Sequence, residues 1–374
     1  MREPVRVLGV AAPGRAELLE EPRPEAPPGG FTVQMRYSGL SAGTELSFFK
    51  GTNPFLSAAW DADLGLFDPQ GTGTGYPVER LGYMQVGEVI ESRSDLVAPG
   101  RLVALTCGHR EAYGLDPAQE RFVVVPDDLD PLLGIYVSHM GPICANGILH
   151  AAAEAGGREV TELGAGVRGR RVLVVGAGVV GLLTALFARH GGAAEVVVAD
   201  RSSERLAAAR GLGADTLDLE HEDDPARGLK RRWRVGPGDA GADVAFQCRG
   251  QPEALAFALR ALRPQGTVID LAFYQGGAAE VRLGEEFHHN GLALRCAQIG
   301  RVPAGLAPAW TRERLSHETI GMLRAHGAAV LEHIITDVVA FADAPAVIAD
   351  LAARRRQPIQ AVFAMGPERE MTSS

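Results

Sequence analysis

The sequence predicts an α/β protein with two domains, one built on a doubly wound parallel sheet and one rich in β-strands. Three observations support this fold class. From about residue 169 onward, apolar strand-like runs alternate with helix-like segments. Residues 1–148 instead hold short β-like pieces that Pro and Gly separate. Finally, a chain of 374 residues is longer than one hydrophobic core usually organises.

The β-rich part is expected to be antiparallel and barrel-like. Its predicted strands cover residues 31–37, 85–91, 101–105 and 121–125. Residues 331–374 return to a strand–helix–strand pattern, with HIITDVVAF, a helix over 344–355, and IQAVFAM. We expect this segment to close back on the first domain. The polar tail from residue 366 to 374 is expected to be disordered.

The parallel-sheet domain is expected over residues 149–330. Its predicted strands are 172–175, 196–199, 242–248, 267–273 and 292–299, and its predicted helices are 204–211, 252–262 and 312–326. Ser202 and Ser203 are candidate N-caps for the first of these helices. The charged segment 220–241 contains Gly and Pro and is expected to be a surface excursion. Such alternation places helices on both faces of the sheet.

A glycine pattern joins the first strand of this domain to its helix. Gly176 allows the tight turn, Gly178 lets the backbone approach a pyrophosphate, and Gly181 lets helix and strand pack closely. The amides of Val179 and Val180, at the start of the helix, complete a phosphate site. The second strand ends on Asp200, about 20 residues beyond Gly181, where a carboxylate binds ribose hydroxyls.

With 46 glycines in the chain, the glycine spacing alone is weak evidence, and a nucleotide-free turn that merely needs its glycines is the alternative. The ordered strand, helix, second strand and terminal acid together predict dinucleotide binding in a Rossmann domain. Asp200 repels a 2′-phosphate and so favours NAD over NADP. Arg201 next to it complicates this choice, because an arginine at this place can bind the 2′-phosphate.

Composition excludes several function classes. The net charge of −9 argues against nucleic acid or an anionic membrane as the main partner. No apolar run reaches transmembrane length, and the start MREPVRVLGV lacks a signal-peptide pattern. We therefore expect a cytoplasmic protein with no membrane partner. The four cysteines form no CxxC motif, so neither a zinc knuckle nor a disulfide framework is indicated.

Taken together, these features resemble the medium-chain dehydrogenase/reductase superfamily. The resemblance covers nearly the whole chain and rests on the glycine turn, DVAFQCRGQPEALAFALRALRPQGTVIDL and SGLSAGTELSFFKG. It implies a GroES-like catalytic domain over 1–148, a Rossmann domain over 149–330 and a return over 331–374. It also implies a small-molecule substrate and a homodimer or homotetramer. SAGTEL and GYMQVG are further similar to the bacteriochlorophyllide hydroxyethyl dehydrogenases.

The departures from the family concern zinc. Against the zinc alcohol dehydrogenase segment G-x-C-G-T-D-x-H, Ala42 takes the place of the ligand cysteine and Ser47 that of the histidine. Tyr83 stands where the family has a ligand histidine, with Met84 in place of the adjacent glutamate. The third ligand position falls at Pro142, and Cys144 would need a two-residue shift. Because catalytic zinc needs three protein ligands, we expect no zinc.

Without a metal, hydroxyl groups are the natural donors to a substrate oxygen. Tyr83 is the predicted acid/base or oxyanion donor, and the resemblance implies that Thr44 is a proton relay. His139 is a candidate substrate contact or proton shuttle, because the resemblance implies a place beside the nicotinamide. Each residue has a structural alternative. Tyr83 and His139 can be packed core side chains, and Thr44 can be the N-cap of a helix over 45–50. Glu45 takes the place of a family acid that lies next to the metal's ligands, and without a metal it is expected to be structural.

The long segment 53–76 lies between the two predicted active-site segments. It is rich in glycine and aromatic residues, and Phe55, Trp60, Leu64 and Phe67 would suit a sizeable apolar substrate. The alternative is an ordinary surface excursion packed by its own side chains.

Three functions remain open from the sequence. The leading one is a zinc-independent, NAD-dependent dehydrogenase acting on a secondary alcohol/ketone pair. The second is a quinone or enoyl reductase. Such enzymes usually prefer NADPH, and Asp200 disfavours NADPH binding. The third is a catalytically inactive NAD-binding sensor or scaffold, since lost ligands are also what an inactive enzyme would show.

Overall fold

The structure is a computed structural model, and it describes residues 3–157 and 159–366. It divides into two compact units, Met140–Ile334 and the remainder, which joins the chain up to His139 to the segment from Ile335 onward. The boundaries differ from the expected 148/149 and 330/331. One helix, α2 (Met140–Gly156), runs across the first expected boundary. Another, α7 (Arg312–His333), runs across the second, so each helix stays whole within one unit.

The second unit is the doubly wound parallel sheet that the sequence predicts. Its strand order is β12-β11-β10-β15-β16-β17, with the chain reversing direction across the sheet between β10 and β15. The strands span β10 Arg171–Val175, β11 Glu195–Asp200, β12 Asp215–Asp218, β15 Ala242–Gln247, β16 Leu262–Asp270 and β17 Ala293–Cys296. All five pairings are parallel, which confirms the Rossmann fold class.

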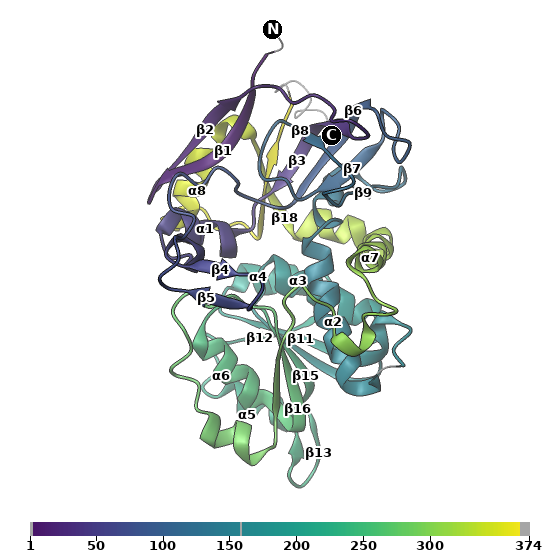
Figure 1. Ribbon diagram of the computed structural model, residues 1–374. Coiled ribbons are helices and arrows are strands. Elements are labelled where there is room, and N and C mark those ends of the chain that lie inside the picture. Colours follow the sequence, from purple (N-terminus) through teal and green to yellow (C-terminus); the bar gives the residue numbers. More distant parts are fainter. Residues whose placement is uncertain (1–2, 158, 367–374) are drawn as a thin grey trace. The chain divides into compact units, whose positions relative to one another are not determined.

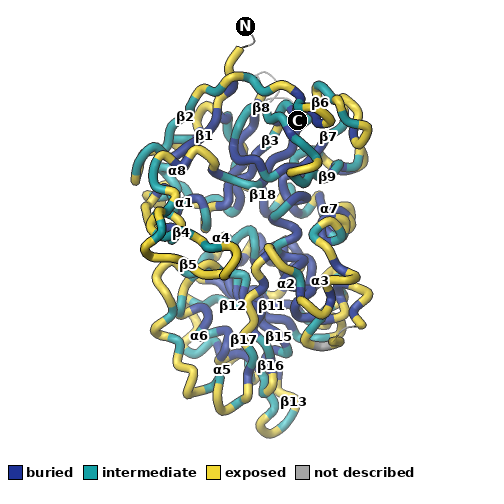
Figure 2. Tube along the Cα trace, in the orientation of Figure 1, coloured by how far each residue is buried: buried dark blue, intermediate teal, exposed yellow. Residues whose placement is uncertain are grey.

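Helices cover both faces of this sheet (Figure 1). One layer contains α2, α3 (Val179–His190), α4 (Ser203–Gly211) and α7, and the other contains α5 (Pro225–Arg232) and α6 (Pro252–Ala261). The central strands β10 and β11 are buried along nearly their whole length, as Figure 2 shows. Burial on both faces explains why they appear in the sequence as continuous apolar runs.

The segment 220–241 is more than a surface excursion, and here the expectation was wrong. Asp224 caps α5 by accepting a hydrogen bond from the N–H of Arg227. Leu229 and Trp233 are 2% and 3% exposed and belong to the apolar core under the sheet. A short hairpin of β13 (Arg234–Gly236) and β14 (Asp239–Ala240) follows. This helix has only one turn of apolar residues, between charged flanks, so the apolar periodicity in the sequence was too short to predict it.

Helix α6 ends at Ala261, close to the expected end at residue 262, but the next strand, β16, begins at Leu262 and not at Thr267. Leu262 pairs with Ala242, and the register then shifts before Thr267 pairs with Val244. A proline in a sheet is tolerated at such an irregularity, where its missing N–H breaks no ladder hydrogen bond. The strand also ends at Asp270, three residues before the end that the sequence predicts.

The first unit contains a seven-stranded sheet in the order β18-β19-β3-β6-β7-β9, with β8 also pairing with β3. The strands are β3 Phe31–Gly39, β6 Gln85–Ser92, β7 Leu102–Leu105, β8 Ala112–Leu115, β9 Val123–Val124, β18 Ile335–Ala340 and β19 Gln360–Ala364. A separate hairpin joins β1 (Val5–Ala12) to β2 (Arg15–Glu21). The antiparallel pairings of β3 with β6 and β8 agree with the expected β-rich domain.

The C-terminal segment joins the sheet of the first unit through two strand pairings. β19 pairs antiparallel with β3 and parallel with β18. Phe341 and Phe363, from the return, share one apolar core with Phe31 and Leu105 from the N-terminal part. Helix α8 (Ala344–Ala352) lies between the two returning strands in the sequence. Of the tail expected to be disordered, residues 367–374 lie outside the described residues.

Among the described helices, none combines the length and the apolar character that crossing a lipid bilayer requires.

His150 gives the second unit a predicted dependence of stability on pH. Its side chain on α2 is 7% exposed, and neither ring nitrogen makes a well-aligned hydrogen bond to a described residue. Burial, with Arg295 nearby, lowers the pKa of His150 from 6.5 to about 4. As the pH falls from about 6.5 to about 4, His150 binds a proton in the unfolded chain but stays neutral in the folded chain. The free energy of unfolding should then fall, by roughly 3 kcal/mol at most.

Urea unfolding at pH 7.5 and 4.5 measures this change. The His150→Leu variant should lose less stability over the interval than the wild type. The exposed His317 provides the control, since His317→Leu should leave the pH dependence as it is. Equal pH dependence in the wild type and His150→Leu would contradict the assignment.

Candidate active site and cofactor site

The glycine turn between β10 and α3 has the geometry that a dinucleotide site needs. Gly176 has a φ of +99°, a left-handed conformation that side chains disfavour, and its N–H donates to the carbonyl of Ala199 at 2.8 Å. A Cβ at Gly181 would lie 1.8 Å from the carbonyl oxygen of Gly176, so only glycine fits there. Gly178 is the N-cap of α3 and has no side chain to cover the helix start.

The first turn of α3 presents its N–H groups, because the first residues of a helix have no intrahelical acceptor. Val179 and Val180 are the first two residues of that turn and are partly exposed. With Gly178 they form the kind of helix start that binds phosphate through amide groups and the helix dipole. The predicted phosphate residues therefore lie together at the carboxyl end of β10.

Asp200 ends β11 beside this turn and is only 6% exposed. Its Oδ2 accepts the N–H of Ala177 at 2.8 Å, and its Oδ1 accepts the N–H groups of Arg201 and Ser202 at 2.8 and 2.9 Å. A carboxylate offers about four acceptor positions, so one remains, on Oδ2, for a ribose hydroxyl. The sequence predicted a ligand for both ribose hydroxyls. In this conformation Asp200 can take one, and it also fastens the turn.

Two arginines lie near this carboxylate. The side chain of Arg201 is exposed, and Ser202 caps α4 through its hydroxyl, which accepts the N–H of Arg205. Arg205 was not identified from the sequence. Its Nη1 lies 3.4 Å from where a Cβ of residue 178 would be, which places a guanidinium beside the phosphate turn. The position of Arg205 in the first turn of α4, after Asp200, was the available signal.

A second polar cluster lies at the carboxyl ends of β15 and β16, and the sequence reasoning missed it. Gln247 donates to the hydroxyl of Tyr274 at 3.1 Å, and Tyr274 donates to Oδ2 of Asp270 at 3.0 Å. Burial raises the pKa of Asp270, which is 8% exposed. Ligands of doubly wound sheets bind outside this edge, so the cluster is a further candidate for cofactor contact.

In the first unit, the structure brings Tyr83 and His139 together. Tyr83 follows Gly82, whose φ is +95°, and precedes β6. The two rings meet edge to face with centroids 4.6 Å apart. The phenol of Tyr83 is hydrogen-bonded to the hydroxyl of Ser41, the N-cap of α1 (Ala42–Lys50). Tyr83 is partly exposed, as a group that meets a substrate must be.

Thr44 lies elsewhere in its local structure than the sequence suggested. Helix α1 begins at Ala42, so Thr44 is inside the first turn and is not the N-cap. Within the described residues, its hydrogen bonds run through the backbone, with its N–H on Ser41 and its carbonyl accepting the hydroxyl of Ser47 at 2.5 Å. Ser41 is therefore the hydroxyl that contacts Tyr83. An earlier helix start in SGLSAGTEL would have pointed to it.

Glu45 and His109 form a buried pair beneath these residues. Glu45 is 2% exposed and His109 is fully buried, and Oε2 of Glu45 lies 2.6 Å from Nε2 of His109. The other oxygen, Oε1, accepts the N–H of Ser41 at 2.7 Å. His109 was not singled out from the sequence, because nothing near it in the chain suggests that its ring meets a residue of α1.

The segment 53–76 forms a short hairpin of β4 (Ala59–Asp61) and β5 (Leu66–Asp68). Phe67 packs edge to face on Phe55 and on Trp60, with centroids 5.2 and 5.0 Å apart. These rings are 41–47% exposed, and Leu64 is 71% exposed. The aromatic side chains thus pack on each other and still present apolar surface to solvent.

The donor set at the family's zinc positions does not fit a zinc ion. Ala42 and Pro142 have no ligand atom, and the phenol of Tyr83 is bonded to Ser41. The thiol of Cys144 contacts the carbonyl of Val180 at 3.4 Å, and burial raises its pKa to about 12, so it is held as a neutral thiol. Over residues 3–157 and 159–366, no three His, Cys, Asp or Glu side chains converge as metal ligands.

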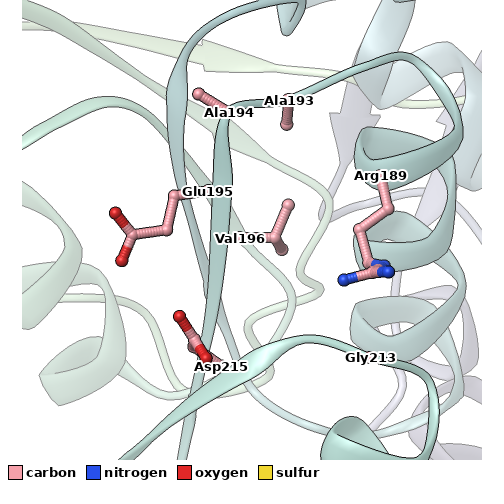
Figure 3. Close-up of a pocket in the computed structure, with 7 residues that line it drawn as sticks. All are labelled: Arg189, Ala193, Ala194, Glu195, Val196, Gly213 and Asp215. Atoms are coloured by element: carbon pink, nitrogen blue, oxygen red, sulfur yellow. The ribbon is translucent and has the colours of Figure 1, made fainter.

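A surface cavity of about 240 Å³ lies at the other end of the Rossmann strands, away from the glycine turn (Figure 3). Arg189, at the end of α3, faces it from one side, and Glu195 and Asp215, at the starts of β11 and β12, line it with Gly213. These are the amino ends of the strands. Because cofactors of this fold bind at the carboxyl ends, the cavity is separate from the glycine turn.

Comparison with known proteins supports this architecture. The zinc-binding dehydrogenase family matches residues 179–303. The D-guloside 3-dehydrogenase of Escherichia coli K12 is 28% identical over 320 residues, covering 84% of this chain and 86% of the relative. The (R,R)-butanediol dehydrogenase of Bacillus subtilis is 24% identical over 309 residues, covering 75% and 78%.

Among solved structures, a Sinorhizobium meliloti protein described as a zinc-binding dehydrogenase, with NADP bound, superposes with a TM-score of 0.71. It is 22% identical, and the superposition covers 97% of this chain and all of that one. That likeness shows the fold, and the named relatives are dehydrogenases. With the family match over residues 179–303, these relatives support the resemblance to the alcohol dehydrogenase-like members of the medium-chain dehydrogenase/reductase superfamily.

Proposed function

We propose that this protein is a zinc-independent, NAD(H)-dependent dehydrogenase of a secondary alcohol/ketone pair. The observation that carries the proposal is the hydroxyl pair of Ser41 and Tyr83, beside His139, at a family position where a metal ligand is expected. A dehydrogenase needs a group that moves a proton to or from the substrate oxygen, and a positioned phenol is such a group.

The cofactor proposal rests on the glycine turn. Gly178, Val179 and Val180 would hold the pyrophosphate through backbone N–H groups, and Asp200 would accept one ribose hydroxyl. The carboxylate disfavours a 2′-phosphate, which supports NAD over NADP. Arg201 and Arg205 are the cations that a 2′-phosphate would use, so the preference depends on Asp200. When bound, the nicotinamide supplies the acceptor or donor of the hydride.

The proton would pass through the phenol oxygen of Tyr83. The hydroxyl of Ser41 can donate to that oxygen, and the O–H of Tyr83 then serves as the donor to the substrate oxygen. In ketone reduction the phenol gives up its proton, and the hydrogen bond from Ser41 stabilises the phenolate that remains. In alcohol oxidation the same atoms act in reverse. His139 is the proposed shuttle between Tyr83 and solvent.

The relatives support the substrate class. A guloside oxidised at position 3 and an (R,R)-butanediol both carry their reacting hydroxyl on a secondary carbon. The exposed rings of Phe55, Trp60 and Phe67 favour a substrate with a sizeable apolar part. A cytoplasmic homodimer or homotetramer remains part of the proposal. The edge strand β17, with Leu294 41% exposed, is a surface that a second copy can cover.

Removing the charge of Asp200 should weaken NAD binding. In Asp200→Asn, the ribose hydroxyl and the N–H of Ala177 lose a charged acceptor, so the Kd for NAD should rise roughly tenfold to a hundredfold. Discrimination against NADP should shrink at the same time. Isothermal titration with both dinucleotides measures the two effects. Asp218→Asn is the matched control, because Asp218 ends the neighbouring strand β12 and also accepts a backbone N–H. An unchanged Kd for NAD in Asp200→Asn would contradict the ribose assignment.

Replacing Tyr83 by Phe should remove the proton donor and leave the ring contact with His139. We expect kcat to fall by about 10²- to 10⁴-fold with little change in the KM for NAD. A panel of secondary alcohols, ketones, quinones and enones, each with NAD(H) and NADP(H), provides the assay. Turnover of enones or quinones alone would favour a reductase, and no turnover of any substrate would favour a sensor.

Two further variants separate the hydroxyls near Tyr83. Ser41→Ala should lower kcat, since Ser41 contacts the phenol, whereas the proposed relay at Thr44 is tested by Thr44→Val. A large loss in Thr44→Val with none in Ser41→Ala would restore the relay that the sequence predicts.

Zinc independence predicts how much zinc the native protein carries. Purified protein should carry well under one zinc ion per chain and should keep its activity after dialysis against a chelator, because the ligand positions hold no three donors. Native mass spectrometry measures the metal content and reports the number of chains in the same spectrum. One bound zinc per chain, with activity lost on its removal, would overturn the proposal.

A further inference from the structure

We propose that Glu45 and His109 are positioning residues that hold Tyr83 and its hydrogen bond with Ser41 in place. This inference rests on the proposed function and adds a buried pair of residues that supports the proposed proton donor. The pair lies in the first unit, within the same hydrogen-bonded cluster as Ser41 and Tyr83. Neither side chain can meet a substrate directly, since Glu45 is 2% exposed and His109 is fully buried.

The hydrogen bonds around His109 fix its tautomer. Gln85 donates from Nε2 to the hydroxyl oxygen of Ser38 at 2.9 Å, and that oxygen lies 2.5 Å from Nδ1 of His109. An ionised Glu45 can only accept, so Nε2 of His109 carries a proton and donates it to Oε2. In a neutral imidazole Nδ1 then has no proton, and it accepts the hydroxyl hydrogen of Ser38. The donors run in one direction, from Gln85 through Ser38 and His109 to a carboxylate at Glu45.

A buried carboxylate needs donors, and Glu45 has them on both oxygens. The imidazole of His109 serves Oε2, and the N–H of Ser41 serves Oε1. Glu45 also lies in the first turn of α1, where the positive end of the helix dipole favours a negative charge. The charge is thus held at one place, and its hydrogen bond fixes the backbone of Ser41.

Both ends of the Ser41–Tyr83 hydrogen bond therefore depend on the pair. Glu45 holds the backbone of Ser41, whose hydroxyl contacts the phenol. His109 packs against Gly82, the residue before Tyr83, where a Cβ would lie 2.6 Å from Nε2. The ring of Phe363 in the returning strand β19 supports His109 from another side, with centroids 5.1 Å apart. If the imidazole is lost, the carboxylate of Glu45 and the backbone at Gly82 both lose their contact with it.

A double-mutant cycle on His109 and Tyr83 tests the inference. His109→Phe keeps an aromatic ring against Gly82 and Phe363 but removes both ring nitrogens. It should lower kcat roughly tenfold to a hundredfold, because small displacements of a reacting group are costly. In the Tyr83→Phe background the same change should have little further effect on kcat, since residues that act through one group are not additive. His109→Gln, which can still donate to Glu45, should recover most of the loss.

Two readouts separate positioning from general damage. The pH profile of kcat should shift in His109→Phe, whereas the KM for NAD should not. Asp243→Asn is the control: it breaks a partly buried ion pair with Arg171 in the other unit and should lower Tm without shifting the profile. Equal loss of kcat from His109→Phe in both Tyr83 backgrounds would overturn the inference.

A readout that does not need activity distinguishes this inference from the proposed function. With fluorotyrosine incorporated, the ¹⁹F resonance missing from Tyr83→Phe belongs to Tyr83. That resonance should move in His109→Phe and not in Asp243→Asn. An unmoved resonance overturns the positioning role even if Tyr83 proves essential. A moved resonance in a protein whose activity is insensitive to Tyr83→Phe supports the positioning role and removes only the proposed catalytic one.

Discussion

A buried carboxylate must find hydrogen-bond donors, and this constraint shapes the candidate site in each unit. Asp200 meets it with three backbone N–H groups from the glycine turn and the start of α4. Glu45 meets it with the N–H of Ser41 and the imidazole of His109. In both cases at least one donor is a backbone N–H group next to the residues of the candidate site. The negative charge therefore fixes the groups that would bind a cofactor or hold the phenol.

The two sites differ in how local their determinants are. The cofactor turn is made by residues that lie close in the sequence, and the backbone shows why Gly176 and Gly181 are glycines. The Tyr83 site joins residues from α1, the approach to β6, and the segment before α2. The residues that support Tyr83 include His109, which itself contacts Phe363 near the C-terminus. The contact of Phe363 with His109 depends on β19, whose pairing with β3 brings the C-terminal return into the core.

The absence of metal-binding residues at the family's positions also changes what the fold must supply. A zinc ion would provide a fixed positive charge, and under the proposed function a phenol held at the right distance takes its place. That requirement gives a physical reason for a buried ion at α1 in a protein whose apolar core could have been closed more simply. Burying a charge is costly and adds little to stability, so such pairs are expected where they serve a function.

The sequence alone predicted the Rossmann fold, the β-rich partner domain and the return of the C-terminal segment, but not the order of strands within either sheet. These predictions follow from apolar periodicity and from glycines whose roles are local. It also pointed to Tyr83 and His139, because a family pattern marked their positions. It missed α5 and its buried Trp233, whose single apolar turn is hidden among charges, and it began α1 too late, at residue 45 instead of Ala42. Only the tertiary structure could decide that Ser41 and not Thr44 contacts Tyr83, and that His109 meets Glu45. Those contacts depend on how distant strands place their side chains, and no spacing along the chain records that.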